Sequence, residues 1–455
     1  MDMQWLARLG DAIWSPWMLG LFLLVGLYYS LRTGFFQLFG FRVWWKGTVG
    51  TLFSRKRQTK GGVTQLQALS TALAATIGTG SIAGVATAVF FGGPGAVFWM
   101  WVSAVLGMMT GCAEKTLAVR FRERAPEGGW RGGPMCYIRD GLGMRRLAEV
   151  FSVLCVAQTL AGGNLVQANS IAASLNSAFG ADKLAVALVT AVLAGAVTLG
   201  GIGRIGKVSE KLVPAMAALF VGGGGIVLLA HAEAIPGALW DILRYAFQPK
   251  AVIGGYGMGT AMRFGIARGV FTNEAGLGTS AIAHAAADVD DPVQQGMWGI
   301  FEVFAATIVV CSVTALVILT SGVYSPESAQ AAIQSGNVPP EMLGAPLTGS
   351  AFATVLGDPG RALVSLCLLL FAFTSLLGSC YYGQRGIETL TGRPWVMNCY
   401  RGAYLAMVVL GCLGDVTAVW QLVDVIDGLL ALPNLIALLL LSPAAIELIQ
   451  AKRRS

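Results

Sequence analysis

The sequence is poor in charged residues and in histidine. Of its 455 residues only 12% are Asp, Glu, Lys or Arg, and only His231 and His284 are histidine, whereas soluble domains contain about 25% charged residues. It has no HExxH metal motif, no GxSxG nucleophile motif and no Cys/His cluster with metal-site spacing. Gly78-x-Gly80 follows no predicted strand, so its context argues against a dinucleotide site. These absences argue against a soluble protein and against an enzyme.

Two further signals are missing. The eight cysteines form no CxxC pair and lie mostly inside apolar runs, so we interpret them as small packing residues. The first apolar run opens at Trp14 without a basic segment before it or an Ala-x-Ala site after it. We therefore expect no cleavable signal peptide.

Apolar residues and glycine are abundant instead. Hydrophobic residues make up 55% of the chain, and 60 residues are glycine, which lets membrane helices approach closely. Apolar runs of about 20 residues, the length of a membrane helix, recur along the chain. We predict an all-α polytopic membrane protein with eleven transmembrane helices. The predicted spans are 14–31, 64–91, 95–118, 147–176, 184–200, 208–230, 255–287, 294–321, 360–381, 396–413 and 417–441.

The basic residues indicate an orientation. With the N-terminus outside, 24 of the 31 Lys and Arg residues fall in predicted inside segments and five in outside segments. Such an excess marks the cytoplasmic side. We therefore predict a multi-pass inner (plasma) membrane protein with an outside N-terminus and a cytoplasmic C-terminus, and no nucleic-acid partner. The inside segments are 32–63, 114–146, 201–211, 382–401 and 442–455.

Two of the ten spans after the leading helix are long and interrupted. The first, 64–91, is interrupted near Gly78, and the sixth, 255–287, near Phe271. Glycine destabilises a helix by about 1 kcal/mol relative to alanine, and polar groups at bilayer depth are tolerated where they line a cavity. Because five spans per half is an odd number, the second half enters the membrane in the opposite direction. The pattern predicts a 5+5 inverted repeat with discontinuous first and sixth core helices.

This repeat divides the chain into five parts. They are the leading helix with a basic cytoplasmic loop (1–63), the first five-helix repeat (64–230), an extracellular loop (231–254), the second five-helix repeat (255–441) and a cytoplasmic tail (442–455). A second outside loop, 322–358, is interpreted either as a lid over a permeation path or as a surface loop.

The first interruption predicts a site for a zwitterion. Where the helix restarts after Gly80, backbone N–H groups at the positive end of the helix dipole can seat a carboxylate. Where the preceding half-helix stops, free carbonyls can coordinate an alkali cation or an ammonium group. A small zwitterion suits this short gap without a charged counter-residue. We expect Gly78, Thr79, Gly80 and Ser81 to bind it.

These stretches resemble a known family, the alanine or glycine:cation symporters, also called sodium:alanine symporters. Residues 74–84, AATIGTGSIAG, resemble its first-span motif, and residues 268–279, RGVFTNEAGLGT, resemble its hallmark. The HAAA ending at 284–287, GNLVQANS at 163–170 and LPN at 432–434 extend the likeness over nearly the whole chain. Thr272 and Thr279 stand where the family commonly has serine, and Asp427 where we expect an amide. These departures leave the preferred amino acid open.

The resemblance implies a fold and an ion site. The family shares the fold of the bacterial leucine transporter, in which a sodium ion commonly lies between the first and eighth core spans. The implied ligands are the backbone carbonyls of Ala74, Ile77 and Phe371 and the hydroxyls of Thr374 and Ser375. Neutral oxygens suit a hard cation. Alternatively, the two hydroxyls bond back to their own helix.

Other polar residues at depth are candidates for the substrate site. Asn164 and Gln167 lie three apart in one span, so they are expected to share a face and to bind substrate or to join helices. Phe271 is expected to wall the pocket or to be core packing. The neighbouring hallmark residues expected in the substrate site are Thr272, Asn273 and Gly276.

Charged residues near the second interruption are expected to form a structural or gating charge network. Arg268 and Glu274 are six apart, too far for one regular turn, but an unwound segment could join them in an ion pair. Asp424 could complete this network, and so could Asp427. We interpret Glu114 as an interface or gate residue and His284 as structural.

We therefore expect a sodium-coupled symporter that carries alanine or glycine into the cell by alternating access, as a monomer or weak oligomer in the lipid bilayer. The alternatives are proton coupling through Asp424 or Asp427, a carrier for another neutral amino acid such as glutamine or serine, and a channel or receptor.

Overall fold

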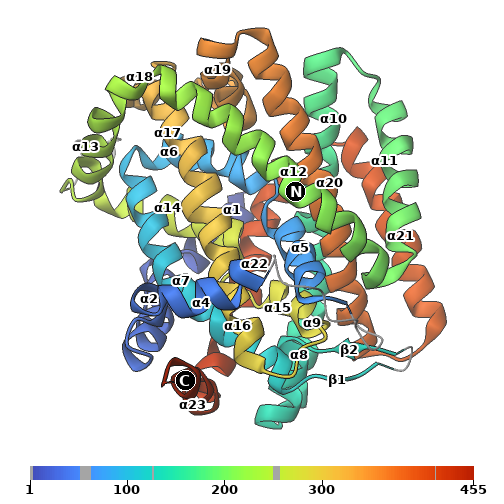
Figure 1. Cartoon of the computed structure of the whole chain (residues 1–455). Coiled ribbons are helices and arrows are strands. Elements are labelled where there is room, and N and C mark those ends of the chain that lie inside the picture. The colour runs from blue at the N-terminus through green and yellow to red at the C-terminus, as the bar shows by residue number, and fades with distance from the viewer. Residues whose placement is uncertain (1–3, 52–62, 126–127, 250–256, 416, 455) are drawn as a thin grey trace.

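The structure, a computed structural model, describes residues 4–51, 63–125, 128–249, 257–415 and 417–454. Residues 52–62 of the predicted inside segment 32–63 and residues 250–256, where the predicted second repeat begins, lie outside the described residues. Elsewhere the chain is mostly helical (Figure 1).

The N-terminal half comprises short leading helices, an interrupted helix and several long helices. These are α1 (Gln4–Ile13), α2 (Pro16–Arg32), α3 (Phe36–Phe39), α4 (Phe41–Gly47), η1 (Val49–Thr51), α5 (Gln65–Thr76), η2 (Thr79–Ser81), α6 (Ala83–Gly92), α7 (Gly95–Arg120), β1 (Glu123–Arg124), β2 (Trp130–Arg131), α8 (Pro134–Cys136), η3 (Tyr137–Gly141), α9 (Arg145–Leu160), η4 (Ala161–Leu165), α10 (Val166–Phe179), α11 (Lys183–Thr198), α12 (Gly201–Ala230), η5 (Ala232–Ala234) and α13 (Ile235–Ala246).

The C-terminal half again begins with an interrupted helix. Its elements are α14 (Met258–Asn273), α15 (Thr279–Ala285), α16 (Pro292–Val303), η6 (Phe304–Cys311), α17 (Ser312–Thr320), α18 (Pro326–Ser335), η7 (Pro340–Met342), α19 (Gly344–Leu356), α20 (Asp358–Leu390), α21 (Pro394–Leu413), α22 (Thr417–Leu440) and α23 (Ser442–Arg454).

The predicted class, a largely helical polytopic membrane protein, is confirmed. In the described part of the chain, seven helices are long and apolar enough to cross a membrane, and three shorter apolar helices also lie in predicted spans. Large apolar side chains such as Leu229 and Val192 are 79% and 70% exposed, as expected for a surface that faces lipid. The count of eleven crossings and the inverted repeat stay predictions.

Several helices lie in, or extend into, segments that the sequence predicts as loops. The loop expected at 231–254 contains α13, and the one at 322–358 contains α18 and α19. The cause in α19 is an apolar face whose Leu347, Ala351 and Phe352 are buried where the helix packs on α20, α6 and α12. Helix α12 begins seven residues before the predicted 208. The chain is also not purely helical, because β1 and β2 form a short antiparallel hairpin.

The first core helix is interrupted where the glycines predicted. Helix α5 starts in a reciprocal cap in which Thr64 Oγ1 accepts from the Gln67 N–H and Gln67 Oε1 accepts from the Thr64 N–H. It ends at Thr76, and Gly78 is extended, with φ −112° and ψ −154°. One short 3₁₀ turn, η2, then leads into α6.

The second interruption lies three residues later than predicted. Phe271 belongs to the last turn of α14, and the helix breaks from Glu274 to Gly278. Three residues there have positive φ: Glu274 at 54°, Gly276 at 97° and Gly278 at 80°. Glycine adopts this left-handed region without steric cost, so Gly276 and Gly278 set the break rather than the earlier Gly269.

The two interrupted helices lie side by side in the centre of the molecule. Helix α14 packs on α6, and α15 packs on α5. The long α20 approaches α5 closely, because a Cβ added at Gly378 would lie 2.8 Å from the Ala75 Cβ. Figure 1 shows α13, α18 and α19 at one end of the molecule and the β1–β2 hairpin, α8 and α23 at the other. The breaks therefore lie between the two ends.

Candidate functional site

A small cavity lies between the two helix breaks. Its volume is about 20 Å³, which is roughly the room that one water needs. A bound amino acid therefore requires the surrounding side chains to move apart. Of the predicted substrate residues, four line this cavity: Gly78, Gly80, Gln167 and Phe271. The remaining lining residues are Ala75, Thr76, Gln158, Gly162, Gly163, Glu274, Ser375 and Ser379.

Glycine at the first break permits the close approach that forms this cavity. A Cβ added at Gly80 would lie 2.9 Å from the Phe271 ring. One added at Gly78 would lie 2.6 Å from Ser375 Oγ and 3.3 Å from Gln167 Oε1. Side chains at either position would therefore enter the space between the breaks.

Gln167 is joined directly to the first break. Its Oε1 accepts from the Thr79 N–H at 3.3 Å, and its Nε2 donates to the Gly162 carbonyl at 3.1 Å. The Thr79 hydroxyl is buried and has no hydrogen-bond partner among the described residues. The Ser81 N–H bonds back to the Gly78 carbonyl at 3.2 Å. The Ser81 hydroxyl is likewise buried without a hydrogen-bond partner among the described residues, and neither Thr79 nor Ser81 lines the small cavity.

The structure does not bring Asn164 to the cavity. Its Nδ2 donates to the Tyr404 carbonyl of α21 at 2.8 Å. Asn164 lies in a π-helical turn, η4, and Gln167 lies in the regular helix α10 that follows it, and their side-chain amides reach different neighbours, α21 and the first break. Asn164 instead joins two helices.

Three hallmark residues of the second break are also directed elsewhere. Thr272 Oγ1 bonds back to the Arg268 carbonyl at 2.8 Å. Asn273 donates to Thr307 Oγ1 at 3.1 Å and accepts from the Ala275 N–H at 3.0 Å. The Gly276 N–H donates to Glu114 at 2.8 Å. These groups shape and anchor the break and do not line the cavity.

Of the candidate sodium residues, Ala74 and Ser375 meet where α5 ends against α20. Ser375 Oγ lies 3.1 Å from both the Ala74 and the Ala75 carbonyl oxygens. Thr374 Oγ1 lies 3.0 Å from the Phe371 carbonyl. The alternative of back-bonding to the same helix therefore describes Thr374, while Ser375 reaches across to α5. The structure brings together neutral oxygens of the kind that a hard cation binds.

The gate residues divide into two separate groups. Arg268 forms a two-pronged ion pair with Asp424 of α22, with distances of 3.0 and 3.1 Å. Trp14 Nε1 also donates to the Asp424 carbonyl at 2.7 Å. Glu274 does not join them, because its left-handed backbone turns it toward Thr279, whose hydroxyl it accepts at 2.5 Å. The expected Arg268–Glu274 pair is wrong.

Two larger cavities flank the small one. The α19-side cavity, about 550 Å³, is lined by α10, α19, α20 and Trp420. Trp420 lies 5.8 Å from the Phe271 ring, centroid to centroid, so this ring pair separates the α19-side cavity from the small one. The hairpin-side cavity, about 750 Å³, is lined by Tyr381, Gln384 and several arginines at the other end of α20.

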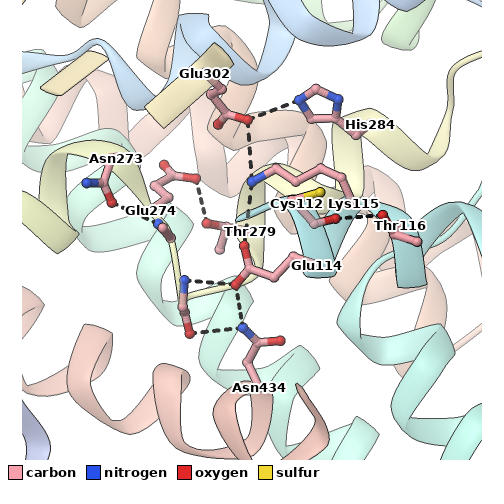
Figure 2. A network of polar contacts seen from close by, with 12 residues as sticks. Cys112, Glu114, Lys115, Thr116, Asn273, Glu274, Thr279, His284, Glu302 and Asn434 are labelled. Atoms are coloured by element: carbon pink, nitrogen blue, oxygen red, sulfur yellow. Dashed lines mark hydrogen bonds and ion pairs between the residues drawn. The ribbon is translucent and has the colours of Figure 1, made fainter. Parts of the chain in front are cut away.

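A buried charge cluster lies beside the second break (Figure 2). Lys115 Nζ of α7 lies 3.5 Å from Glu114 Oε2 and 3.4 Å from Glu302 Oε2 of α16, and all three side chains are fully buried. His284 Nε2 contacts Glu302 Oε2 at 3.0 Å, and His284 Nδ1 contacts Gln295 at 2.7 Å. Sequence reasoning missed Lys115 and Glu302, although ionisable residues inside spans were a usable signal.

The cluster also holds the unwound segment in place. Glu114 Oε1 accepts from the Gly276 N–H and, at 2.7 Å, from Asn434 of α22. Asn434 donates to the Gly276 carbonyl at 2.9 Å and accepts from Tyr137. Both backbone polar groups of Gly276 are therefore satisfied inside the protein, as an unwound segment at membrane depth requires.

Comparison with known proteins agrees with this architecture. A transporter of Haemophilus influenzae described as uncharacterized is 41% identical over 97% of this chain and 94% of its own. The sodium/alanine symporter AgcS of Methanococcus maripaludis is 38% identical over 96% and 94%. The crystal structure of an Eremococcus coleocola manganese transporter shares the fold, with a TM-score of 0.54 and 15% identity over 85% of this chain and 78% of that one.

The family profile gives the most extensive match. The profile described as the sodium:alanine symporter family matches residues 1–454. The prediction of a membrane transporter rather than an enzyme is therefore confirmed. This chain belongs to the sodium:alanine symporter family.

Proposed function

We propose that this protein is a sodium-coupled symporter that carries a small neutral amino acid, alanine or glycine, into the cell by alternating access. The observation that carries the proposal is the cavity where two helix breaks meet α20. Glycines of the first break and Ser375 of α20 both line this cavity. The Ser375 hydroxyl is also within hydrogen-bond distance of two backbone carbonyls of α5. An amino acid and a sodium ion would share this neighbourhood, so binding of each would favour the other.

The size of the cavity supports a small substrate. Four glycines line it, and Phe271 closes one side. Large side chains would displace Phe271 and Trp420 together, because their rings pack against each other. Serine or glutamine remains the alternative substrate, and a competition panel against labelled alanine would rank them.

The flanking cavities support alternating access. Phe271 lines the small cavity and Trp420 lines the α19-side cavity, so their ring pair stands between the two. The Arg268 guanidinium, paired with Asp424, lies 5.9 and 6.0 Å from the centroids of these two rings. We propose that they form the gate toward the outside, and that the hairpin-side cavity leads to the cytoplasm. The positive-inside pattern supports this direction, because the hairpin and α23 lie at the predicted cytoplasmic end (Figure 1).

Uptake of radiolabelled alanine into proteoliposomes tests this function. An inward sodium gradient should drive accumulation, and a proton gradient alone should not. Accumulation driven equally by protons would favour the alternative of coupling through Asp424 or Asp427. Asp427 is buried in α22, beside Asp424 and Gln158.

A further inference from the structure

Glu274 stands where the cavity and the buried charge cluster meet. It is one of two described residues other than glycine with positive φ, a conformation that stores strain and is concentrated at functional sites. Its side chain is buried, and it is the one carboxylate among the residues that line the small cavity. The break thus places a carboxyl group at the small cavity, which Gln158 and Gln167 also line.

The two carboxyl oxygens of Glu274 have different surroundings. Oε2 accepts from Thr279 Oγ1 at 2.5 Å. The other oxygen accepts no hydrogen bond from any described residue, and Figure 2 shows it directed away from Thr279. One oxygen is therefore held by the protein, and the other is available to a ligand in the cavity.

The nearby cations are already paired with other carboxylates. Lys115 lies between Glu114 and Glu302, and Arg268 is paired with Asp424. The remaining titratable neighbours of Glu274 add no positive charge. They are the carboxyl group of Asp427, the Cys155 thiol, the Tyr382 hydroxyl and His284, whose ring contacts Glu302.

A buried carboxylate without a counter-ion is costly, and a cation placed beside it removes that cost. An α-amino acid brings such a cation. Its carboxylate would be drawn to the first break, which leaves the ammonium group free to face the second. An ammonium–carboxylate contact is a charge-assisted hydrogen bond, roughly twice as strong as a neutral one.

We propose that the free carboxyl oxygen of Glu274 receives the ammonium group of the transported amino acid and so selects amino acids over carboxylates that lack an amine. This inference rests on the proposed function. It replaces the expectation that the site needs no charged counter-residue. Glu274 is thus a specificity-determining residue, and Thr279 orients it.

The test compares alanine with propionate, which is alanine without its ammonium group. Each competes with labelled alanine for sodium-driven uptake in proteoliposomes, and the ratio of the two inhibition constants is measured. In Glu274→Gln the alanine constant should rise about tenfold or more, the scale of one charge-assisted hydrogen bond, while the propionate constant does not rise. The ratio should therefore fall at least about tenfold.

Glu302→Gln is the matched control. It removes a buried carboxylate of the same cluster that does not line the cavity, so the ratio should keep its wild-type value whatever the uptake rate. If Glu274→Gln abolishes uptake, the same ratio is measured as sodium-dependent thermal stabilisation of the purified protein by each ligand. Glu274→Asp should retain most of the discrimination.

The outcomes separate the two proposals. Wild-type uptake with an unchanged ratio in Glu274→Gln would overturn the role of Glu274 and leave the proposed function standing. An equal fall of the ratio in Glu302→Gln would also overturn the role of Glu274. The loss of discrimination would then follow from removing any carboxylate of the buried charge cluster. Wild-type protein without sodium-driven alanine uptake would overturn the proposed function, and this inference with it.

Discussion

Gln167 is the side chain that ties α10 to the first helix break. Because its amide accepts from the Thr79 N–H and lines the cavity, we expect Gln167→Ala to weaken alanine binding by about 1–2 kcal/mol, the worth of one or two hydrogen bonds. The half-saturation concentration for alanine uptake measures this loss. Asn164→Ala is the control, since Asn164 bonds to α21: it should lower stability but not affinity. Equal affinity losses in both variants would contradict the assignment.

Ser375 connects α20 to the end of α5. Ser375→Ala combined with Thr374→Ala removes two hydroxyls that are candidate sodium ligands, so we expect a large rise in the sodium concentration that gives half-maximal uptake. The measurement is uptake as a function of sodium at saturating alanine. Ser365→Ala, about 15 Å away along the same helix, should leave it unchanged. An unaltered sodium dependence in the folded double variant would remove these hydroxyls from the ion site.

At the scale of elements, the two breaks differ in how they are held. The first is fixed by packing and by Gln167, whereas the second is fixed by Glu114 and Asn434 from two other helices. The second break is therefore the more tightly anchored at its centre. Movement during transport is expected where α14 meets α22, at the Arg268–Asp424 pair.

The Arg268–Asp424 pair provides a prediction about that movement. Arg268→Asp places two carboxylates opposite each other, which should hold α14 and α22 apart and reduce alanine uptake severely. The exchange of charges in Arg268→Asp plus Asp424→Arg should restore part of the rate, because the pair is remade in reverse. Initial uptake rates at equal membrane expression decide this. Full activity in the single variant would show that the pair does not gate transport.

At the scale of the whole molecule, the distribution of charge predicts the orientation. A fluorescent protein fused after Ser455 should fluoresce, because it folds in the cytoplasm, and a phosphatase fused there should be inactive. The same two reporters before Met1 should give the opposite pattern. Fluorescence at both ends would contradict an odd number of crossings.

The features that depend on composition and local backbone conformation could be predicted from the sequence. The apolar runs predicted a helical membrane protein with several spans. Gly78 and Gly80 marked the first break, because glycine tolerates backbone conformations that end a helix. The second break was predicted three residues too early. The sequence has several glycines there, and it does not show which of them adopt positive φ.

Long-range pairing was beyond the reach of a single sequence. The contact of Lys115 with Glu302 joins α7 to α16, and the contact of Glu114 with Asn434 spans 320 positions. Of the two roles predicted for Asn164, its bond to the Tyr404 carbonyl of α21 matches the joining of helices, and the sequence alone did not decide between them. Helix α19 was missed because burial against α20 and α6, rather than a long apolar run, stabilises it.

Substitution of Gly78 tests most directly whether the meeting of the breaks forms the binding site. In Gly78→Ala the added Cβ would lie 2.6 Å from Ser375 Oγ, whereas Gly84, in the helix after the break, has open space at its Cβ. Equilibrium binding of labelled alanine to the purified protein is measured with and without sodium. We predict that Gly78→Ala loses sodium-dependent alanine binding while Gly84→Ala keeps it. Wild-type binding in a folded Gly78→Ala protein would contradict the site.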